Sequence, residues 1–178
     1  MGNVTPIRAS SDLIAEKIAM VRERLATKPD GVIEALAREV GLPTQVVLEA
    51  IPVEQRVFVS PNAFESLWHE MAGWGDVLFI VHTPDIVLEC EGSLPIGSFG
   101  AGYYNIHSDS PIGGHIRAEN CRAIYIVDRL FHGRRSCSVQ FFNAAGEAMF
   151  KVFVRRGKDR NLIAEQLTLF EVMRAGRA

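Results

Sequence analysis

Apolar side chains recur at helical spacing near the start of the chain. Ser11 is a suitable capping residue, and the positions after it predict an amphipathic helix that ends near residue 26. Its apolar face consists of Ile14, Ile18, Val21 and Leu25, spaced four, three and four residues apart. Residues 1–9 have no such pattern and are predicted to form a loose tail.

Two shorter helices are predicted next. Asp30 can cap a helix that is stopped by Gly41, and Pro43 suits the first turn of a helix that ends before Pro52. Together with the first helix they define a helical section over residues 10–52. A short strand follows at residues 57–59.

A fourth helix is predicted between Pro61-Asn62 and Gly73. One face of it carries Phe64, Leu67, Trp68 and Met71. After Gly75 the apolar period changes from that of a helix to that of a strand.

Residues 77–83 and 86–91 predict two strands of a hairpin, joined by the turn Pro84-Asp85. Because strand side chains alternate between two faces, the first strand has two different sides. Leu78, Ile80 and His82 share one side, and Val77, Phe79 and Val81 share the other.

The stretch 93–114 is rich in glycine and is interrupted by Pro95 and Pro111. It is interpreted as a long loop around one short strand at residues 103–107, and loops of this length often shape binding sites.

Further strands are predicted in the C-terminal part, followed by a helix that Asp159 or Asn161 caps and that runs through Met173. The strands cover residues 115–117, 123–131, 136–143 and 148–155. The predicted fold class is therefore α+β: an antiparallel β-sheet section with flanking helices, preceded by an N-terminal helical section. Residues 10–178 are expected to form one domain, with helices over 10–52 and the sheet with its last helix over 53–178.

Composition narrows the possible functions. The chain has 178 residues, of which 48% are hydrophobic and 22% charged, and a formal net charge of -2. This balance argues against a general binder of nucleic acid or of anionic membranes. No apolar run reaches the ~20 residues that span a bilayer, and the first residues do not form a signal peptide. The three cysteines form no C-x-x-C pair, so reduced, buried thiols are expected.

Two histidines lie within apolar, strand-like segments. His82 lies near the end of the predicted strand at residues 77–83, and His115 follows Gly113-Gly114. A neutral imidazole offers a nitrogen lone pair to iron, and the two glycines would let a planar ligand approach the backbone. The alternative is a structural role, in which each ring only satisfies a hydrogen bond.

The segments around these histidines resemble the intracellular haem-utilisation carrier family HutX/ChuX. Similar segments are residues 118–121, 138–143 and 147–151, and the resemblance extends from about Phe64 to Phe170. It implies a bacterial protein in the cytoplasm that takes up imported haem as cargo and passes it to a downstream acceptor. It also implies a homodimer, and it places His82 and His115 at the family's haem-associated positions, as candidate ligands of the iron.

Haem propionates require cations, and apolar groups must cover the porphyrin. Arg117 lies two residues beyond His115, on the same strand face, and is the first choice for a propionate partner; Lys151 and Arg122 are weaker choices. Phe99 and Tyr103 flank glycines in the predicted loop and are the preferred pocket aromatics.

Two other classes of function remain open. A haem-degrading enzyme that uses an external reductant would need one proximal histidine and an open distal side, but no oxygen-activating group is evident, so a non-enzymatic carrier is expected. Residues 32–52 resemble a helix-turn-helix, yet the second helix has no Arg or Lys to meet phosphates. We interpret it as a helical hairpin that completes the fold, with no nucleic-acid partner and no stable association with a membrane.

Overall fold

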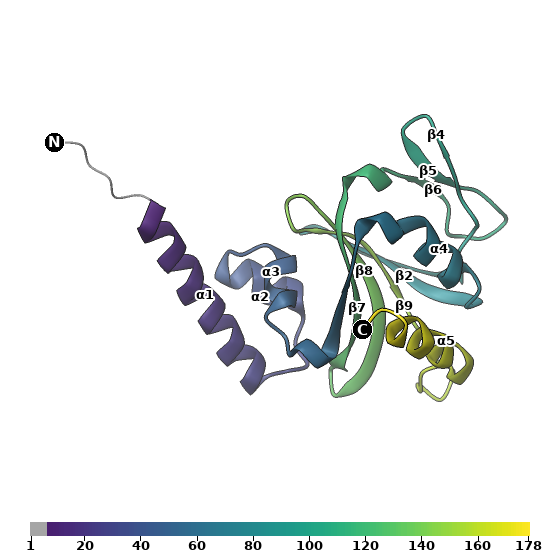
Figure 1. Ribbon diagram of the computed structural model, residues 1–178. Helices are drawn as coiled ribbons and strands as arrows, with labels where there is room; N and C mark the ends of the chain where they lie inside the picture. Colours follow the sequence, from purple (N-terminus) through teal and green to yellow (C-terminus); the bar gives the residue numbers. More distant parts are fainter. Residues whose placement is uncertain (1–6) are drawn as a thin grey trace.

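The computed structural model describes the backbone of residues 7–178 and the side chains of residues 11–178. The first helix, α1 (Ile7–Thr27), starts earlier than predicted, so residues 7–9 belong to it and not to a tail. The rest of the predicted tail, residues 1–6, lies outside the described residues. A small sheet of three strands lies at one end of the molecule, and Figure 1 shows α1 to α3 at the other end.

The centre of the fold is a six-stranded antiparallel sheet with the strand order β1-β7-β8-β9-β2-β3. Its long strands form where β-branched and aromatic residues recur, and β7 pairs with β8 along nearly its whole length. The strands are β1 (Arg56–Val59), β2 (Asp76–His82), β3 (Val87–Ser93), β7 (Cys121–Phe131), β8 (Arg134–Asn143) and β9 (Ala148–Phe153). The predicted α+β class and N-terminal helical section are confirmed.

Both faces of this sheet are covered, so it divides the interior into two cores. Ile124 and Ile126 of β7 enter the core formed by α4 (Phe64–Ala72) and α5 (Ala164–Ala175). Tyr125 and Val127, one position along, enter the core formed by the N-terminal helices. The alternation of strand side chains thus supplies apolar surface to both sides.

The short strand predicted at residues 103–107 is present as β5 (Tyr103–Ile106), but the loop predicted around it, residues 93–114, is wrong in part. The loop also contains β4 (Ser98–Gly100), and both strands form a small sheet with β6 (Gly114–Ile116) in the order β4-β5-β6. Here glycine serves close packing: a Cβ on Gly97 would lie 2.4 Å from the Tyr104 ring. At this position glycine therefore marks close packing and not a flexible loop.

Two predicted helix caps are also wrong. Helix α2 (Ile33–Val40) begins after Val32, and the backbone carbonyl of Asp30 accepts a hydrogen bond from His132. Helix α5 begins after Ile163, because Asp159 uses its carboxylate to bind Asn161 in the preceding turn. In both cases a turn forms where a cap was expected.

The two short helices α2 and α3 (Thr44–Glu49) pack onto the sheet as the predicted hairpin. Val47 and Leu48 are fully buried in the N-terminal core. Thr44, at the start of the second helix, is buried and donates a hydrogen bond to Glu147. These residues therefore face the body of the protein. Among the described helices, none combines the length and hydropathy that a membrane span requires.

Asp128 of β7 ties the C-terminal helix to the sheet. Arg135 donates two hydrogen bonds to its carboxylate, at 3.0 and 2.7 Å, and also binds Glu171 of α5. Arg174 of α5 lies 3.4 Å from the same carboxylate. Burial alone raises the pKa of Asp128, but the hydrogen bonds and charges of Arg135, with the charge of Arg174, outweigh it and the net pKa is lowered.

This network predicts a stability effect of Asp128→Asn. The variant should lose about 1–3 kcal/mol of unfolding free energy at neutral pH, because two arginines lose their buried anion. Since the pKa of Asp128 is lowered in the folded state, its contribution is present above the ordinary aspartate pKa and disappears as the pH falls through the folded value. Urea unfolding at pH 7 and pH 3 measures both effects.

The exposed Asp12→Asn variant is the control and should unfold like the wild type. If Asp128→Asn is as stable as Asp12→Asn at pH 7, the network does not hold the helix.

Candidate functional site

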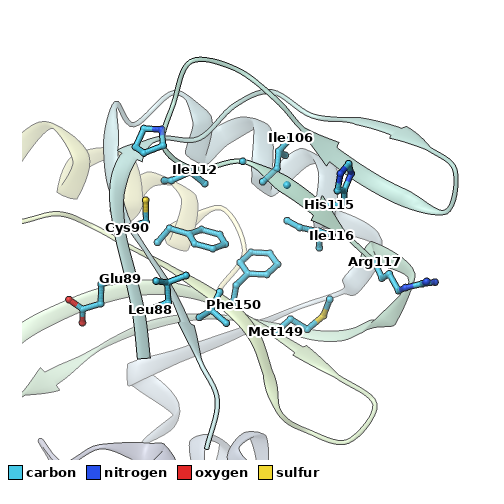
Figure 2. A pocket seen from close by; sticks show the side chains of 15 residues that line it. Leu88, Glu89, Cys90, Ile106, Ile112, His115, Ile116, Arg117, Met149 and Phe150 are labelled. Carbon is cyan, nitrogen blue, oxygen red and sulfur yellow. The ribbon is translucent and has the colours of Figure 1, made fainter. Parts of the chain in front are cut away.

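A cavity of about 580 Å³ lies between one face of the six-stranded sheet and the small sheet. We call it the His115 cavity. In Figure 2, Leu88, Met149 and Phe150 lie on one side of it, and Ile106, Ile112 and Ile116 on the other. Its wall is largely apolar, and its apolar members are Phe79, Val81, Leu88, Ile106, Pro111, Ile112, Ile116, Met149 and Phe150.

The imidazole of His115 has a defined orientation because Asn105 holds it. These residues are direct partners in the β5–β6 pairing, and Nδ1 of His115 lies 2.7 Å from Oδ1 of Asn105. The amide nitrogen of Asn105 donates to the carbonyl oxygens of Ser98, Gly100 and Tyr103, at 3.2, 3.1 and 3.4 Å.

The amide hydrogen bonds determine which nitrogen of His115 carries the proton. Since the amide nitrogen of Asn105 faces three carbonyls, its oxygen faces the ring and can only accept. Nδ1 of His115 must therefore be the donor, and Nε2 keeps its lone pair. His115 is among the residues that line the cavity and its side chain is exposed, so a ligand can reach this lone pair from solvent.

Arg117 lines the same cavity, as the strand period predicted. Its guanidinium donates a 2.8 Å hydrogen bond to the hydroxyl of Tyr103 and lies 4.6 Å from the centre of that ring. Its other contact is Glu119, at 3.8 Å. About half of the Arg117 side chain is exposed, and in Figure 2 it extends away from the centre of the cavity, so its guanidinium lies at the rim and is accessible to an anionic group.

Phe99 and Tyr103 do not line the His115 cavity. They line a smaller cavity of about 160 Å³ with Ala118 and Glu119. Phe99 packs against Tyr104 and is 58% exposed. The hydroxyl of Tyr103 accepts a hydrogen bond from the guanidinium of Arg117. The glycines between Phe99 and Tyr103 lie at the end of β4 and in the turn to β5, and Phe99 is paired with Tyr104 across these two strands.

His82 lies on the opposite face of the sheet, in a second cavity of about 470 Å³ that we call the His82 cavity. Leu78, Ile80 and His82 line it, whereas Phe79 and Val81 line the His115 cavity. The predicted division of β2 into two sides is confirmed. The two histidines of one chain therefore do not face a common ligand.

Charged groups surround the His82 ring. Its Nδ1 lies 3.6 Å from Oε1 of Glu34, and the same carboxylate forms an ion pair with Lys151. Burial, and then the charge of Arg38, lower the pKa of His82, which favours the neutral ring. Burial lowers the pKa of Lys151 to about 8. Arg122, the other weaker propionate candidate, lines neither cavity and donates to the carbonyl of Glu119.

Asn105 and Glu34 were not identified from the sequence. Asn105 acts through the pairing of β5 with β6, which the sequence pattern did not show. Glu34 reaches His82 only because α2 packs on the sheet. No local spacing signals either contact.

The His115 cavity defines a class of ligand-binding protein. An apolar wall, a half-exposed cation and an imidazole with a free Nε2 suit a planar, apolar ligand with an acidic edge and a metal centre. Comparison with known proteins agrees. The chain belongs to the haem utilisation ChuX/HutX family, whose sequence model matches residues 57–173. The family resemblance seen in the sequence is thus confirmed.

Individual relatives cover nearly all of the chain. This chain is 27% identical to the intracellular heme transport protein HutX of Vibrio cholerae. The match extends over 172 residues, which are 96% of this chain and 88% of HutX. A crystal structure of a protein from Agrobacterium tumefaciens is 45% identical, with a TM-score of 0.90, covering 99% and 100% of the two chains. The structure of the heme-binding protein ChuX is 36% identical, with a TM-score of 0.79 and coverage of 88% and 97%.

The Asn105 contact predicts the tautomer of His115 in the ligand-free protein. Nitrogen-15 NMR of the imidazole should find the proton on Nδ1 in the wild type. In Asn105→Ala the ratio of the two tautomers should shift about two- to ten-fold away from this form, as expected for the loss of one neutral hydrogen bond. Asn62→Ala, an exposed control, should leave the ratio unchanged. An unaltered tautomer ratio in Asn105→Ala would show that Asn105 does not orient the ring.

Proposed function

We propose that this protein is an intracellular haem carrier that holds haem non-covalently and delivers it to a downstream acceptor. The observation that carries the proposal is the free Nε2 of His115, fixed by Asn105 at the edge of an apolar cavity. Similarity to HutX, a heme transport protein, and to ChuX, a heme-binding protein, supports the same function.

The residues of the His115 cavity suit haem in three respects. His115 would bind the iron through Nε2. Phe79, Phe150 and their apolar neighbours would cover the porphyrin, and Arg117 would pair with a propionate. Tyr103 would keep the guanidinium of Arg117 in place.

A carrier must also release its cargo, and the site is suited to that. His115 and Arg117 are exposed, so an acceptor protein could reach both contacts. Binding through an imidazole is exchangeable, and the chain lacks the C-x-x-C-H sequence that attaches haem covalently.

His82 is proposed as the second haem-associated histidine, at its own cavity. Leu78, Ile80 and Phe153 give that cavity an apolar surface, and the lowered pKa of His82 keeps its ring neutral. Each histidine would therefore serve a separate cavity of the same chain. Removing one histidine would leave the other as a candidate ligand.

Haemin titration followed by absorption spectroscopy tests both assignments. His115→Ala should weaken haem binding at least ten-fold, a loss of about 1.4 kcal/mol. His82→Ala should remove the remaining histidine-ligated component, so that the double variant lacks a histidine-ligated Soret band. These effects are expected because only a neutral imidazole nitrogen supplies the ligand.

His69→Ala, on the exposed side of α4, is the control and should bind like the wild type. If the double variant also binds like the wild type, both assignments are wrong. Adding an external reductant to the wild-type complex should leave the porphyrin band intact, whereas its loss would indicate haem degradation.

We also propose a homodimer that forms through the sheet section. Strand β3 is at the edge of the six-stranded sheet, where its outer backbone groups can pair with another strand. Val87 and Leu88 of β3 are 52% and 55% exposed, which is unusual for apolar residues on an open edge. A second copy would cover both features by an isologous contact.

Light scattering at micromolar concentration should give twice the chain mass of 19.7 kDa. Val87→Lys should shift the mass toward that of the monomer, because the charge would be buried at the contact. Val172→Lys, at a residue 68% exposed on α5, is the matched control and should remain dimeric. A wild-type mass near that of one chain would reject the dimer.

A further inference from the structure

Three charged or polar side chains from distant parts of the chain meet in the His82 cavity. Glu34 comes from the first turn of α2, His82 from the end of β2 and Lys151 from β9. Their side chains are only 12%, 14% and 8% exposed. Oε1 of Glu34 is shared, since it lies 3.6 Å from Nδ1 of His82 and forms the ion pair with Lys151.

The protein fold itself fixes Glu34 at this place. Ile33, the residue before it, is buried in the N-terminal core, which sets the position of the first turn of α2. A carboxylate in the first turn of a helix also interacts favourably with the helix dipole. Lys151 pairs with Ile80 in the β2–β9 register, so it stands beside the strand that carries His82.

The contact matches the arrangement by which proteins orient imidazole ligands. A carboxylate that faces one ring nitrogen fixes the tautomer, directs the other nitrogen toward the metal and makes the ring a stronger ligand. A carboxylate can only accept, so a hydrogen bond to Glu34 would make Nδ1 of a neutral His82 the donor and leave the lone pair on Nε2. The present separation of 3.6 Å is longer than a hydrogen bond, so the role requires the contact to shorten when the ligand binds.

We propose that Glu34 is a positioning residue for His82, and that its carboxylate holds the imidazole so that Nε2 faces the haem iron. This inference rests on the proposed function, because it assigns a partner to one of the two candidate ligands. It also gives the N-terminal helical section a part in the site, although Glu34 precedes the matched family region, residues 57–173.

The two histidines then differ in the charge of their partners. Asn105 presents a neutral amide oxygen to His115, whereas Glu34 presents an anionic oxygen to His82. An anionic partner gives the imidazole more imidazolate character and stabilises ferric over ferrous iron. Iron bound by His82 should therefore have the lower reduction potential. The charge of Arg38 also acts on this ring, and the other charged side chains that line its cavity are Glu89, Glu91, Arg129, Lys151, Arg155 and Arg156.

The experiment uses ferric haemin and the full-length chain carrying His115→Ala, so that His82 is the only one of the two candidate ligands left. Into this background we introduce Glu34→Gln, which keeps the size of the side chain and removes its charge. Glu39→Gln is the matched control, because Glu39 lies on the same helix, is exposed and pairs with Arg24 at the surface. The readouts are haemin affinity, reduction potential and the iron–histidine stretching band of the ferrous complex.

Glu34→Gln should weaken haemin binding about ten- to hundred-fold. It should also raise the reduction potential and lower the frequency of the iron–histidine band, whereas Glu39→Gln should leave all three unchanged. If Glu34→Gln changes affinity but neither the potential nor the band, Glu34 is merely structural and the inference is rejected. If it behaves like Glu39→Gln in every readout, the inference is rejected as well.

Failure of the proposed function gives a different result. If the His115→Ala background shows no iron–histidine band, His82 does not bind haem, and both its assignment and the role of Glu34 are overturned. If the band is present and disappears with His82→Ala, the ligand is established and only Glu34 is under test. Urea unfolding of the ligand-free variants shows that Glu34→Gln is folded before its spectra are compared.

Discussion

The six-stranded sheet is covered on both faces, and this constraint decides where every other feature of the molecule lies. A strand in such a sheet sends successive side chains into two different interiors. In β7, Ile126 enters one core and Tyr125 the other. In β2 the same alternation separates Phe79 from Ile80, and it places His82 in a cavity that His115 cannot reach. Two cavities with one histidine each are therefore a direct result of the sheet.

Features that depend on local period could be predicted from the sequence. The two sides of β2, the long strands β7 to β9 and the apolar face of α4 all follow from side-chain spacing over a few residues. Arg117 was placed beside His115 for the same reason, since residues two apart on a strand share a face.

Features that depend on long-range pairing could not be predicted in this way. Two strands of the small sheet were predicted, but β4 and the pairing of the three strands were missed. Strand β4 has only three residues, too few to show a period, and the nearby Gly97 serves packing against Tyr104. Asn105 and Glu34 contact their histidines across a strand pair and across a helix–sheet interface. Phe99 lies in a smaller cavity than the one that His115 lines, in a place set by the pairing of β4 with β5. In each case the tertiary arrangement decides the environment of the side chain.

The ion pair between Glu34 and Lys151 is difficult to explain by stability alone. Two charges that are nearly removed from water each cost several kcal/mol of solvation, and their attraction commonly does no more than offset that cost. An apolar pair of similar size would pack against Ile80 and Phe153 without this penalty. What an apolar pair would not provide is an anionic oxygen beside Nδ1 of His82. Lys151 provides a cation beside this carboxylate, and the carboxylate faces Nδ1 of the imidazole. The same three side chains therefore account for the cost of the buried charges and for the orientation of a candidate haem ligand.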